Sequence, residues 1–483
     1  MSSAPPTWPV RLLARPWLLS FVPINAATAG FGVVLPLLIL IPLHGSWADV
    51  ALAATVFNTA VISSSVLWGH LADRYPHRRL FLAINYGSYA ALYGLIALVP
   101  SIGALDLLYG VIGLVAPAGA SASTLLILEK FPEHERANAY ASYQEMAIVG
   151  SMLGLLLGFV WTTDAVALRS LLYVLGALAA VSAVAIWFGI REGDLRARTA
   201  QVAHHADSLM ARTREATGFR ISIPFFPVRP TFTREALRRF RRWAREELRH
   251  ELPLVLAAMF LFNFSASLFN ITLTPYLASV GIATSSIFLV NFANSAGQGL
   301  LFPFSGGLSN RMGPDRLVRY SSYVRALSYL ATAGFAIALL VAPRAFAANV
   351  VAYSIAGGAI AFFTIASSMM LFRSLRGRDS GRILGVNSAL GGLAAVAGAS
   401  VSGVIAVFGN YSIVFMVAAG ALLASLPLWS AATVAFERRR ASDGAAARVG
   451  AEPPPTEPRP PPAPASSERA TTPSGTLRPS KTD

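Results

Sequence analysis

Long apolar stretches alternate with short polar connections along most of the chain. A bilayer core about 30 Å thick requires about 20 mostly apolar residues for one membrane-spanning helix. Twelve stretches of that size occur, six on each side of a long polar segment, and they predict an all-α membrane protein built as two pseudo-symmetric six-helix bundles. The predicted spans are 17–41, 48–71, 79–99, 104–128, 138–161, 167–190, 253–279, 284–307, 317–341, 346–371, 383–407 and 411–434.

The first apolar stretch lies near the N-terminus and could be confused with a secretion signal. Arg11 and Arg15 precede it, and the segment from Asn25 to Ala29 loosely resembles a signal-peptidase site. Hydrophobicity continues through Ile41, however, which makes the stretch too long for an ordinary signal sequence. We therefore expect an uncleaved first membrane helix.

Arginines in the connections predict the orientation of the helices. Every second connection is rich in Arg, whereas the alternate connections contain little beyond Arg169 and Arg344. Because arginine-rich loops stay in the cytoplasm, this pattern predicts a multi-pass protein of the cytoplasmic (plasma) membrane with both termini inside the cell. The arginine-rich side holds Arg11, Arg15, Arg74, Arg78, Arg79, Lys130, Arg136, Arg311, Arg316, Arg319, Arg373, Arg376, Arg378, Arg382, Arg438, Arg439 and Arg440.

Changes in composition along the chain predict its domain organisation. The tail is rich in Pro, Ala, Ser and Thr and cannot bury enough apolar surface to offset the entropy of ordering, so we expect it to be disordered. The expected divisions are a cytoplasmic N-terminus (1–16), a first bundle (17–190), a basic cytoplasmic linker (191–252), a second bundle (253–434) and a disordered tail (435–483).

The linker contains one segment with an amphipathic pattern, at about 231–250. Phe232, Leu237, Phe240 and Trp243 follow helical spacing, and arginines occupy most of the remaining surface. Two interpretations remain open. Such a helix can lie on the anionic headgroups of the membrane, or it can pack beneath the two bundles as a connector.

Composition supports the membrane assignment and excludes several other classes. The chain is 54% apolar and 13% charged, with a mean hydropathy of +0.55. The net charge of +15 is explained by loop arginines, so no nucleic-acid partner is expected. The absence of Cys excludes disulfides, a thiolate nucleophile and a Cys-ligated metal.

Two connections repeat one another. The connection after the second span reads GHLADRYPHRR from Gly69, and the connection after the eighth span reads GGLSNRMGPDR from Gly306. Gly, Leu and Arg recur at matching positions. Arg136 and Arg382 begin the fifth and eleventh spans in the same way, which indicates that the two halves are related by repetition.

This arrangement resembles the major facilitator superfamily of secondary transporters, whose signature loop has a Gly, a Leu, an acidic residue and a basic cluster. The resemblance implies two six-helix bundles around a central cavity that opens alternately to either side of the membrane. It also implies a conformational latch in which Asp73 meets the cytoplasmic end of the eleventh helix and basic residues meet Glu129. The latch residues are Gly69, Asp73, Arg74, Arg78, Arg79, Glu129, Arg136, Gly306 and Arg311.

Departures from the family pattern limit what the resemblance implies. Pro76 replaces the usual Gly of the first loop, and His77 stands where a basic residue is common. Asn310 replaces the acid in the second loop, so a charged latch is expected in the first half alone. The other interpretation is that all these charges only set topology.

The fifth span carries glycines at four-residue spacing but lacks the Gly-Pro typical of proton-driven drug antiporters. An arginine often found in the family's fourth helix is replaced around Tyr109. Both departures argue against a drug/proton exchanger. Gly150, Gly154 and Gly158 are better explained as sites of close helix packing.

Ionisable residues inside the spans are few, and each is costly in a bilayer. Glu145 in the fifth span could carry a proton coupled to substrate, because desolvation raises the pKa of a carboxyl group. It could equally pair with an Arg or stay wet near the cytoplasm. Arg325 in the ninth span is expected to extend towards the cytoplasm with its charge in water.

Uncharged polar residues form stripes on the seventh and eighth spans. Such groups avoid lipid and therefore face either a neighbouring helix or an aqueous cavity, and both interpretations remain open for each residue. A cavity of amides and aromatic rings suits a neutral or amphipathic organic solute. The cavity candidates are Asn25, Asn263, Asn270, Asn291, Asn294, Gln298 and Asn387.

The function that these features predict is a secondary transporter that moves a small organic solute by alternating access, with proton-coupled efflux as one form. The alternatives are a facilitative uniporter and a non-transporting sensor or scaffold on the same fold. No enzyme, cofactor or metal site is expected. The His134-Glu135 pair has Asn138 where a zinc site needs a second His, and no lysine lies in a glycine-rich phosphate loop.

Overall fold

A computed structural model describes residues 16–75, 77–130, 133–162, 165–190, 251–338, 341–374 and 380–449. The chain divides into two compact units, Met1–Ala435 and Phe436–Asp483, and the architecture below is that of the first unit. The predicted amphipathic helix at 231–250 and the rest of the linker at 191–250 lie outside the described residues, as do residues 1–15 and 450–483.

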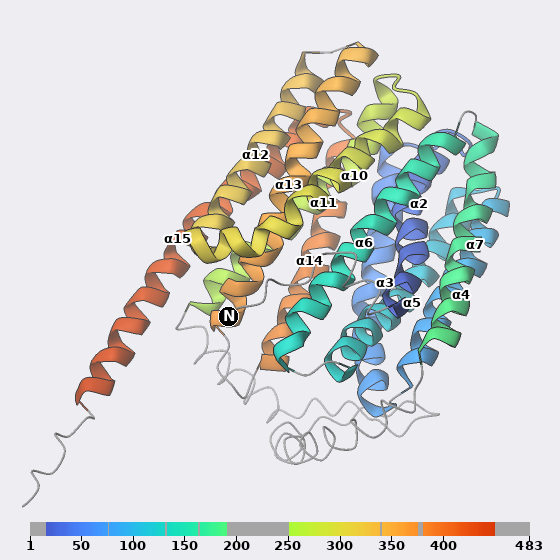
Figure 1. The fold of residues 1–483 in the computed structure, drawn as a ribbon. Helices are drawn as coiled ribbons and strands as arrows, with labels where there is room; N and C mark the ends of the chain where they lie inside the picture. Colours follow the sequence, from blue (N-terminus) through green and yellow to red (C-terminus); the bar gives the residue numbers. More distant parts are fainter. Residues whose placement is uncertain are drawn as a thin grey trace, which may run out of the picture. The chain divides into compact units, whose positions relative to one another are not determined.

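The described residues form twelve α-helices and one short 3-10 helix (Figure 1), and every predicted span overlaps one of the α-helices. The first half contains η1 (Pro16–Ser20), α2 (Phe21–Leu40), α3 (Trp47–Arg74), α4 (Arg78–Leu98), α5 (Ile102–Lys130), α6 (Glu133–Trp161) and α7 (Ala165–Gly189). The second half contains α10 (Leu252–Ser279), α11 (Thr284–Met312), α12 (Pro314–Ile337), α13 (Ala342–Ser374), α14 (Ser380–Ala406) and α15 (Tyr411–Val449).

The last helix runs further than the sequence predicts. Its apolar part was expected to end at 434, with a disordered tail from 435, but α15 continues to Val449. Residues 435–449 are rich in Ala and Arg, which are strong helix formers. A helix leaving the membrane can therefore continue without an apolar face.

Ten of the described helices are long and apolar enough to cross a membrane. The other two, α11 and α12, have comparable lengths of 29 and 24 residues. Polar side chains lower their mean hydropathy, namely Asn291, Asn294 and Gln298 in α11 and Arg316, Arg319 and Arg325 in α12. The chain is thus a polytopic membrane protein, and the full count of twelve spans stays a prediction.

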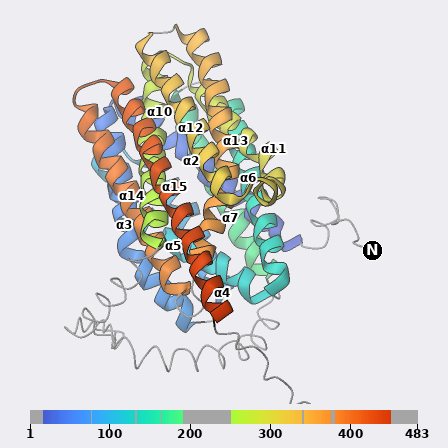
Figure 2. The same cartoon turned by 90° about the vertical axis from the view of Figure 1, so that its left-hand side faces the viewer.

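Helix packing repeats between the halves. In the first half α2 packs on α6, α3 on α5 and α4 on α5; in the second, α10 packs on α14, α11 on α13 and α12 on α13. The halves meet through α3 against α14 and through α6 against α11, two pairs that exchange under the same repeat. Figure 2 shows α3 and α14 side by side, although they belong to different halves of the chain.

Aromatic stacking repeats as well. Phe31 of α2 stacks on Tyr93 of α4 with ring centroids 4.2 Å apart, and Phe269 of α10 stacks on Tyr329 of α12 at 3.7 Å. Each pair joins the first helix of its half to the third. In the sequence, only the connections between helices showed the repeat. The stacked pairs show that the interior of the protein follows the same repeat.

The glycines of α6 allow close helix packing, as expected. A Cβ at Gly150 would lie 2.5 Å from the Val22 carbonyl oxygen on α2, and a Cβ at Gly154 would overlap the Ala26 carbonyl oxygen. In the second half, a Cβ added at Gly398 of α14 would lie 2.8 Å from the Phe264 carbonyl oxygen of α10. Lipid gives helices no hydrophobic reason to associate, so this close approach of backbones supplies the packing attraction instead.

We predict that Gly154→Ala lowers the melting temperature of the purified protein, because the added methyl group meets backbone that cannot move aside; overpacking of this kind costs about 1–3 kcal/mol. Gly94→Ala in α4 is the matched control, since a Cβ there meets nothing within 4 Å. Equal melting temperatures for the two variants would show that the α2–α6 contact is not close-packed.

Candidate functional site

The helix connections define two membrane surfaces. The ends of α2, α4, α6, α10, α12 and α14 and the starts of the helices that follow them lie at one surface, named the arginine-poor surface because Arg169 and Arg344 are almost the only basic residues near these helix ends. The ends of α3, α5, α11 and α13 and the starts of the helices that follow them lie at the other, the arginine-rich surface.

Trp47, the first residue of α3, joins the two halves at the arginine-poor surface. Its indole Nε1 donates a hydrogen bond to Ser402 Oγ on α14 at 3.2 Å, and its ring stacks on Tyr411 of α15 with centroids 4.5 Å apart. Ser402 Oγ lies 3.0 Å from Thr272 Oγ1 of α10. Trp47 is only 6% exposed, so this cluster, the Trp47 seal, fills the space between the halves at this level.

A capping box fixes the position of Trp47. The backbone N–H of Ser46 donates to the Asp49 carboxylate at 2.7 Å, and the backbone N–H of Asp49 donates to Ser46 Oγ at 3.3 Å. These reciprocal bonds satisfy two N–H groups at the start of α3 and hold its first turn rigid. One turn further on, Ala51 faces Gly403 of α14, where an added Cβ would lie 3.1 Å from the Ala51 methyl.

The second contact between the halves, α6 against α11, includes two apolar contacts. Near the arginine-poor surface the fully buried ring of Phe288 packs directly on Gly158, leaving no room for a Cβ there. Towards the middle of the membrane Ile148 of α6 packs with Phe302 of α11 and Ala361 of α13. Since this interface and the α3–α14 interface are exchanged by the repeat, the halves are held on two opposite sides of one axis.

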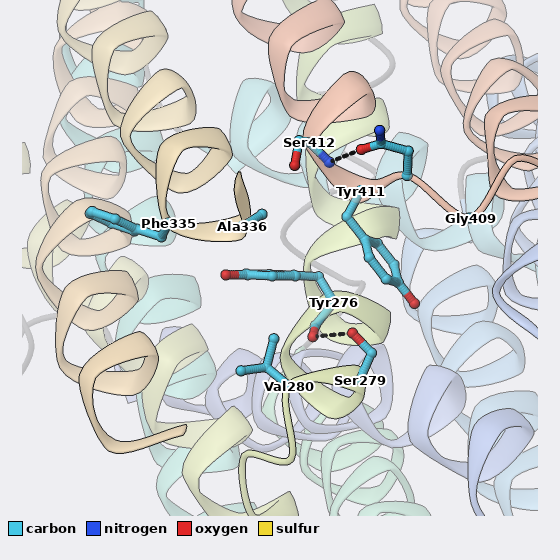
Figure 3. Close-up of a pocket in the computed structure, with 9 residues that line it drawn as sticks. Tyr276, Ser279, Val280, Phe335, Ala336, Gly409, Tyr411 and Ser412 are labelled. Atoms are coloured by element: carbon cyan, nitrogen blue, oxygen red, sulfur yellow. Dashed lines mark hydrogen bonds between the residues drawn. The ribbon is translucent and has the colours of Figure 1, made fainter. Parts of the chain in front are cut away.

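A cavity of about 420 Å³ lies beside the Trp47 seal within the second half (Figure 3). Tyr276 and Ser279 of α10, Phe335 of α12 and Tyr411 of α15 line it, and Ser279 Oγ donates to the Tyr276 carbonyl oxygen at 2.8 Å. Because Tyr411 also stacks on Trp47, the cavity and the seal share a wall. The predicted cavity residues are not among its lining residues.

Three of those predicted residues bond first to their own helix. The side-chain amides of Asn25, Asn263 and Asn291 each donate to the carbonyl oxygen four residues earlier, at 2.7, 2.9 and 3.0 Å. Each bond satisfies one N–H of the amide, and all three side chains are half-buried. The side chains of Gln298 and Asn387 are likewise half-buried.

Asn270 and Asn294 belong to a hydrogen-bonded group across three helices. The Tyr353 hydroxyl of α13 donates to Asn270 Oδ1 of α10 at 3.0 Å, and Asn294 Nδ2 of α11 donates to the Tyr353 carbonyl oxygen at 3.0 Å. Asn270 is exposed while Tyr353 is buried. Asn294 therefore joins two helices, whereas Asn270 presents an amide, oriented by Tyr353, away from the packed interior.

Sequence reasoning passed over Asn85 in the same role. Its Nδ2 donates to the Val115 carbonyl oxygen at 2.9 Å and thereby joins α4 to α5. Gly119 on α5 lies against the same side chain and has no space for a Cβ. Asn85 is the one amide of its span, and the sequence does not show that Val115 and Gly119 of the next helix lie beside it.

Arg325 corrects the sequence prediction. It was expected to extend into the cytoplasmic water, but it is 2% exposed in the middle of α12. Its Nε donates to the Tyr329 hydroxyl at 2.6 Å, and its guanidinium lies 4.8 Å from the Phe262 ring centroid and 5.3 Å from that of Tyr329. The aromatic rings of α10 and α12 surround the charge and replace the water it would otherwise need.

Acidic residues are scarce in this half: between Leu252 and Ala435 the sequence has only Asp315, in the first turn of α12, and Asp379, which lies outside the described residues. Asp315 lies ten positions before Arg325 on the same helix, about 15 Å along its axis. Among the described residues, ring faces and a hydroxyl group are the contacts that stabilise the buried guanidinium.

The predicted latch residues are described in part. The side chain of Arg78 is buried, and Nη1 donates to the Tyr75 carbonyl oxygen at 3.2 Å. The Arg79 guanidinium lies 3.9 Å from the Trp187 ring centroid on α7. Arg311 is exposed in the last turn of α11, and Gly306 is exposed earlier on that helix. The side chains of Asp73, Arg74, Glu129 and Arg136, and the surroundings of Gly69, lie outside the described part.

Glu145 lies three turns into α6, and its side chain is half-buried. It takes part in an interaction with its surroundings, so it is not an isolated carboxyl group. Its position in a helix that forms the interface between the halves is compatible with the predicted coupling role.

The sequence of the chain matches a known protein family. The model of the Major Facilitator Superfamily matches residues 17–333 and 255–476, which together include both halves. The chain belongs to the major facilitator superfamily. Among curated proteins, none matches it.

Solved structures of superfamily transporters have the same fold. A variant of the nucleoside transporter NupG gives a TM-score of 0.62 at 14% identity, covering 86% of this chain and 98% of that one. Unmodified NupG gives 0.57 at 15% identity with the same coverage. A variant of the peptide transporter POT gives 0.64 at 14% identity, covering 87% of this chain and 94% of that one. At such low identities the likeness concerns the fold.

We predict that Arg325→Lys lowers the stability of the purified protein by about 1.5–3 kcal/mol, the range of a hydrogen bond to a charged group. Lysine keeps the charge but loses both the Nε bond to Tyr329 and the planar contact with the Phe262 ring. Thermal denaturation in detergent measures the change. Arg373→Lys, at an exposed arginine of α13, is the matched control. If both substitutions leave the melting temperature unchanged, the aromatic surroundings do not stabilise the charge.

Proposed function

We propose that this chain is a secondary transporter that moves a small organic solute across the cytoplasmic membrane by alternating access. The observation that carries the proposal is the Trp47 seal, in which one aromatic side chain from the first half closes on Ser402 and Tyr411 of the second. A seal at one surface between two repeated halves is what alternating access requires, because each surface must be able to close while the other opens.

The interfaces on either side of the seal support a rocking motion. Trp47, Ala51 and Phe288 make side-chain contacts across the halves near the arginine-poor surface. The contacts depend on one hydrogen bond, one stacked ring pair and apolar packing, with no ion pair in the seal cluster itself. Their separation therefore exposes few groups that are costly to hydrate.

The substrate site that we propose lies between the halves, at the polar residues of α2 and α10. Asn25, Asn263 and Asn270 carry amides, and Asn270 is both exposed and oriented by Tyr353. Amides supply donors and acceptors without fixed charge, which suits a neutral or amphipathic solute. NupG transports nucleosides and POT transports peptides; both are organic solutes rich in hydrogen-bonding groups, and a solute of that general kind is what we propose here.

Coupling and topology are part of the same proposal. Glu145 is the candidate for a proton coupled to transport, in an exporter with both termini in the cytoplasm. Asp73 and the basic residues around it form the proposed latch at the arginine-rich surface. The chain acts as a carrier and catalyses no chemical step, and it needs no cofactor.

Solute exchange in proteoliposomes tests the proposal. Metabolites and drugs are first screened for those that raise the melting temperature, and any hit is then measured in counterflow with and without a pH gradient. A carrier exchanges labelled for unlabelled solute. A channel passes solute without exchange, and a sensor or scaffold binds without flux; either result would overturn the proposal. Flux unaffected by a pH gradient would leave uniport as the mechanism.

Asn270→Ala is expected to weaken solute binding, raising the half-saturation concentration about 2- to 10-fold, the range that corresponds to one lost hydrogen bond. Tyr353→Phe should give a smaller effect in the same direction, because it only frees the Asn270 side chain to rotate. Asn310→Ala, at an exposed amide near the end of α11, is the control. Equal exchange kinetics in all three variants would place the solute elsewhere.

The natural absence of cysteine makes the seal directly testable. A cysteine introduced by Ala51→Cys, at a site 1% exposed behind Trp47, should react slowly with a membrane-impermeant thiol reagent. Removing the ring in Trp47→Ala should raise that rate several-fold, because the seal loses its central side chain. Val407→Cys, 78% exposed in the neighbouring connection, gives the unrestricted rate in both backgrounds. An unchanged rate at the Ala51→Cys site would show that Trp47 does not close this surface.

A further inference from the structure

A second cavity, of about 400 Å³, lies on the outer face of the second half. Arg316, Arg319, Tyr320 and Tyr323 of α12 line one side, and Leu426 of α15 lines the other. The four α12 residues lie between the third and tenth positions of that helix, within about 15 Å of its start at the arginine-rich surface. This depth is that of lipid headgroups and the first part of the acyl chains.

The cavity carries a net positive charge, because one nearby carboxylate faces two arginines. Arg319 Nη1 donates to Ser430 Oγ of α15 at 3.3 Å, its Nε donates to the Asp315 carbonyl oxygen at 3.2 Å, and Nη2 lies 3.7 Å from the Asp315 carboxylate. These contacts hold the Arg319 guanidinium across the gap between the two helices. Arg316 is exposed and adds a second positive charge. Asp315 therefore offsets about one of the two charges.

The cavity opens towards lipid. Tyr320 and Tyr323 at its edge are 59% and 47% exposed, as tyrosines often are at the boundary between headgroups and hydrocarbon. Leu327 and Leu330 follow Tyr323 on the same face of α12, towards the middle of the membrane, and are 46% and 38% exposed. On this face of α12, a cationic pocket near the arginine-rich surface is therefore followed by an apolar strip, Leu327 and Leu330, that runs towards the middle of the membrane.

We propose that this cavity binds one anionic phospholipid, with its phosphate against Arg316 and Arg319 and an acyl chain along Leu327 and Leu330. Arginine binds phosphate oxygens with two parallel N–H groups, and tyrosine hydroxyls add donors at the same depth. The apolar strip favours a lipid over a soluble anion, because an acyl chain can pack along Leu327 and Leu330 whereas a free phosphate has no apolar part. The site is separate from the linker segment 231–250, for which the sequence also predicts headgroup contacts.

The site joins α12 to α15 from outside the bundle. A phosphate held by Arg319 would strengthen the connection that Arg319 already makes to Ser430. An anionic lipid is therefore expected to stabilise the second half, whether or not any solute is transported. This makes the inference independent of the proposed transport function.

The test measures melting temperature and lipid binding by native mass spectrometry on the full chain in detergent. Phosphatidylglycerol is titrated against phosphatidylcholine of the same acyl chains and against inorganic phosphate. We expect stabilisation and bound lipid with phosphatidylglycerol alone. R316Q should weaken binding about 5-fold and R316Q/R319Q about 30-fold, at about 1 kcal/mol for each basic residue near the surface. R373Q, which removes an exposed arginine of α13 at the same membrane surface, should bind like the unmodified protein.

R316Q is informative even where the double variant folds poorly, because Arg316 is exposed and leaves the Arg319 contacts intact. Equal binding of the two lipids would overturn the proposal, since the headgroup charge would then have no effect. Inorganic phosphate that stabilises as well as phosphatidylglycerol would identify a soluble-anion site instead. An equal loss in R373Q would show that binding follows net charge and not this cavity.

Discussion

Helices in hydrocarbon have no hydrophobic reason to associate, because lipid tails are as apolar as their side chains, and every backbone group is already paired within the helix. Close approach of backbones is the contact that remains. Gly154 meets the Ala26 carbonyl oxygen with no room for a methyl group, Gly398 meets that of Phe264, and Gly158 receives the Phe288 ring. These glycines lie in the α2–α6 contact, the α10–α14 contact and the α6–α11 contact between the halves, where a larger residue would not fit.

The same solvent constraint explains where polar groups are found. An amide in a span bonds to its own helix, as Asn25 does, to a neighbouring helix, as Asn85 and Asn294 do, or faces away from the packed interior, as the exposed Asn270 does. A charged side chain in a span needs groups that replace its lost hydration. Arg325 lies near the rings of Phe262 and Tyr329, and its Nε donates to a hydroxyl group, in a half whose sequence holds two acidic residues.

The two halves repeat in packing and differ in chemistry. Stacked pairs join the first and third helices of each, Phe31 with Tyr93 and Phe269 with Tyr329, and the interface pairs exchange under the repeat. Yet the signature loop has Asp73 in one half and Asn310 in the other, and the arginine buried in the middle of a helix, Arg325, belongs to the second half, whereas the buried Arg78 of the first half begins α4. A symmetric frame with unequal chemistry fits a carrier in which the halves share one motion while solute and coupling groups are divided unevenly between them.

The sequence by itself determined the helices, their pairing into two related halves and the family. Span length, hydropathy and loop motifs are local properties, and a bilayer imposes the same length on every helix. The glycine spacing of α6 was read correctly for the same reason, since it follows one face of one helix. Tertiary structure alone decided which amides join helices and which face outward, that Arg325 lies among aromatic rings, and that Trp47 closes on Ser402, 355 residues away. These are contacts between distant segments, and a residue's own neighbours in sequence do not reveal what the fold will place beside it.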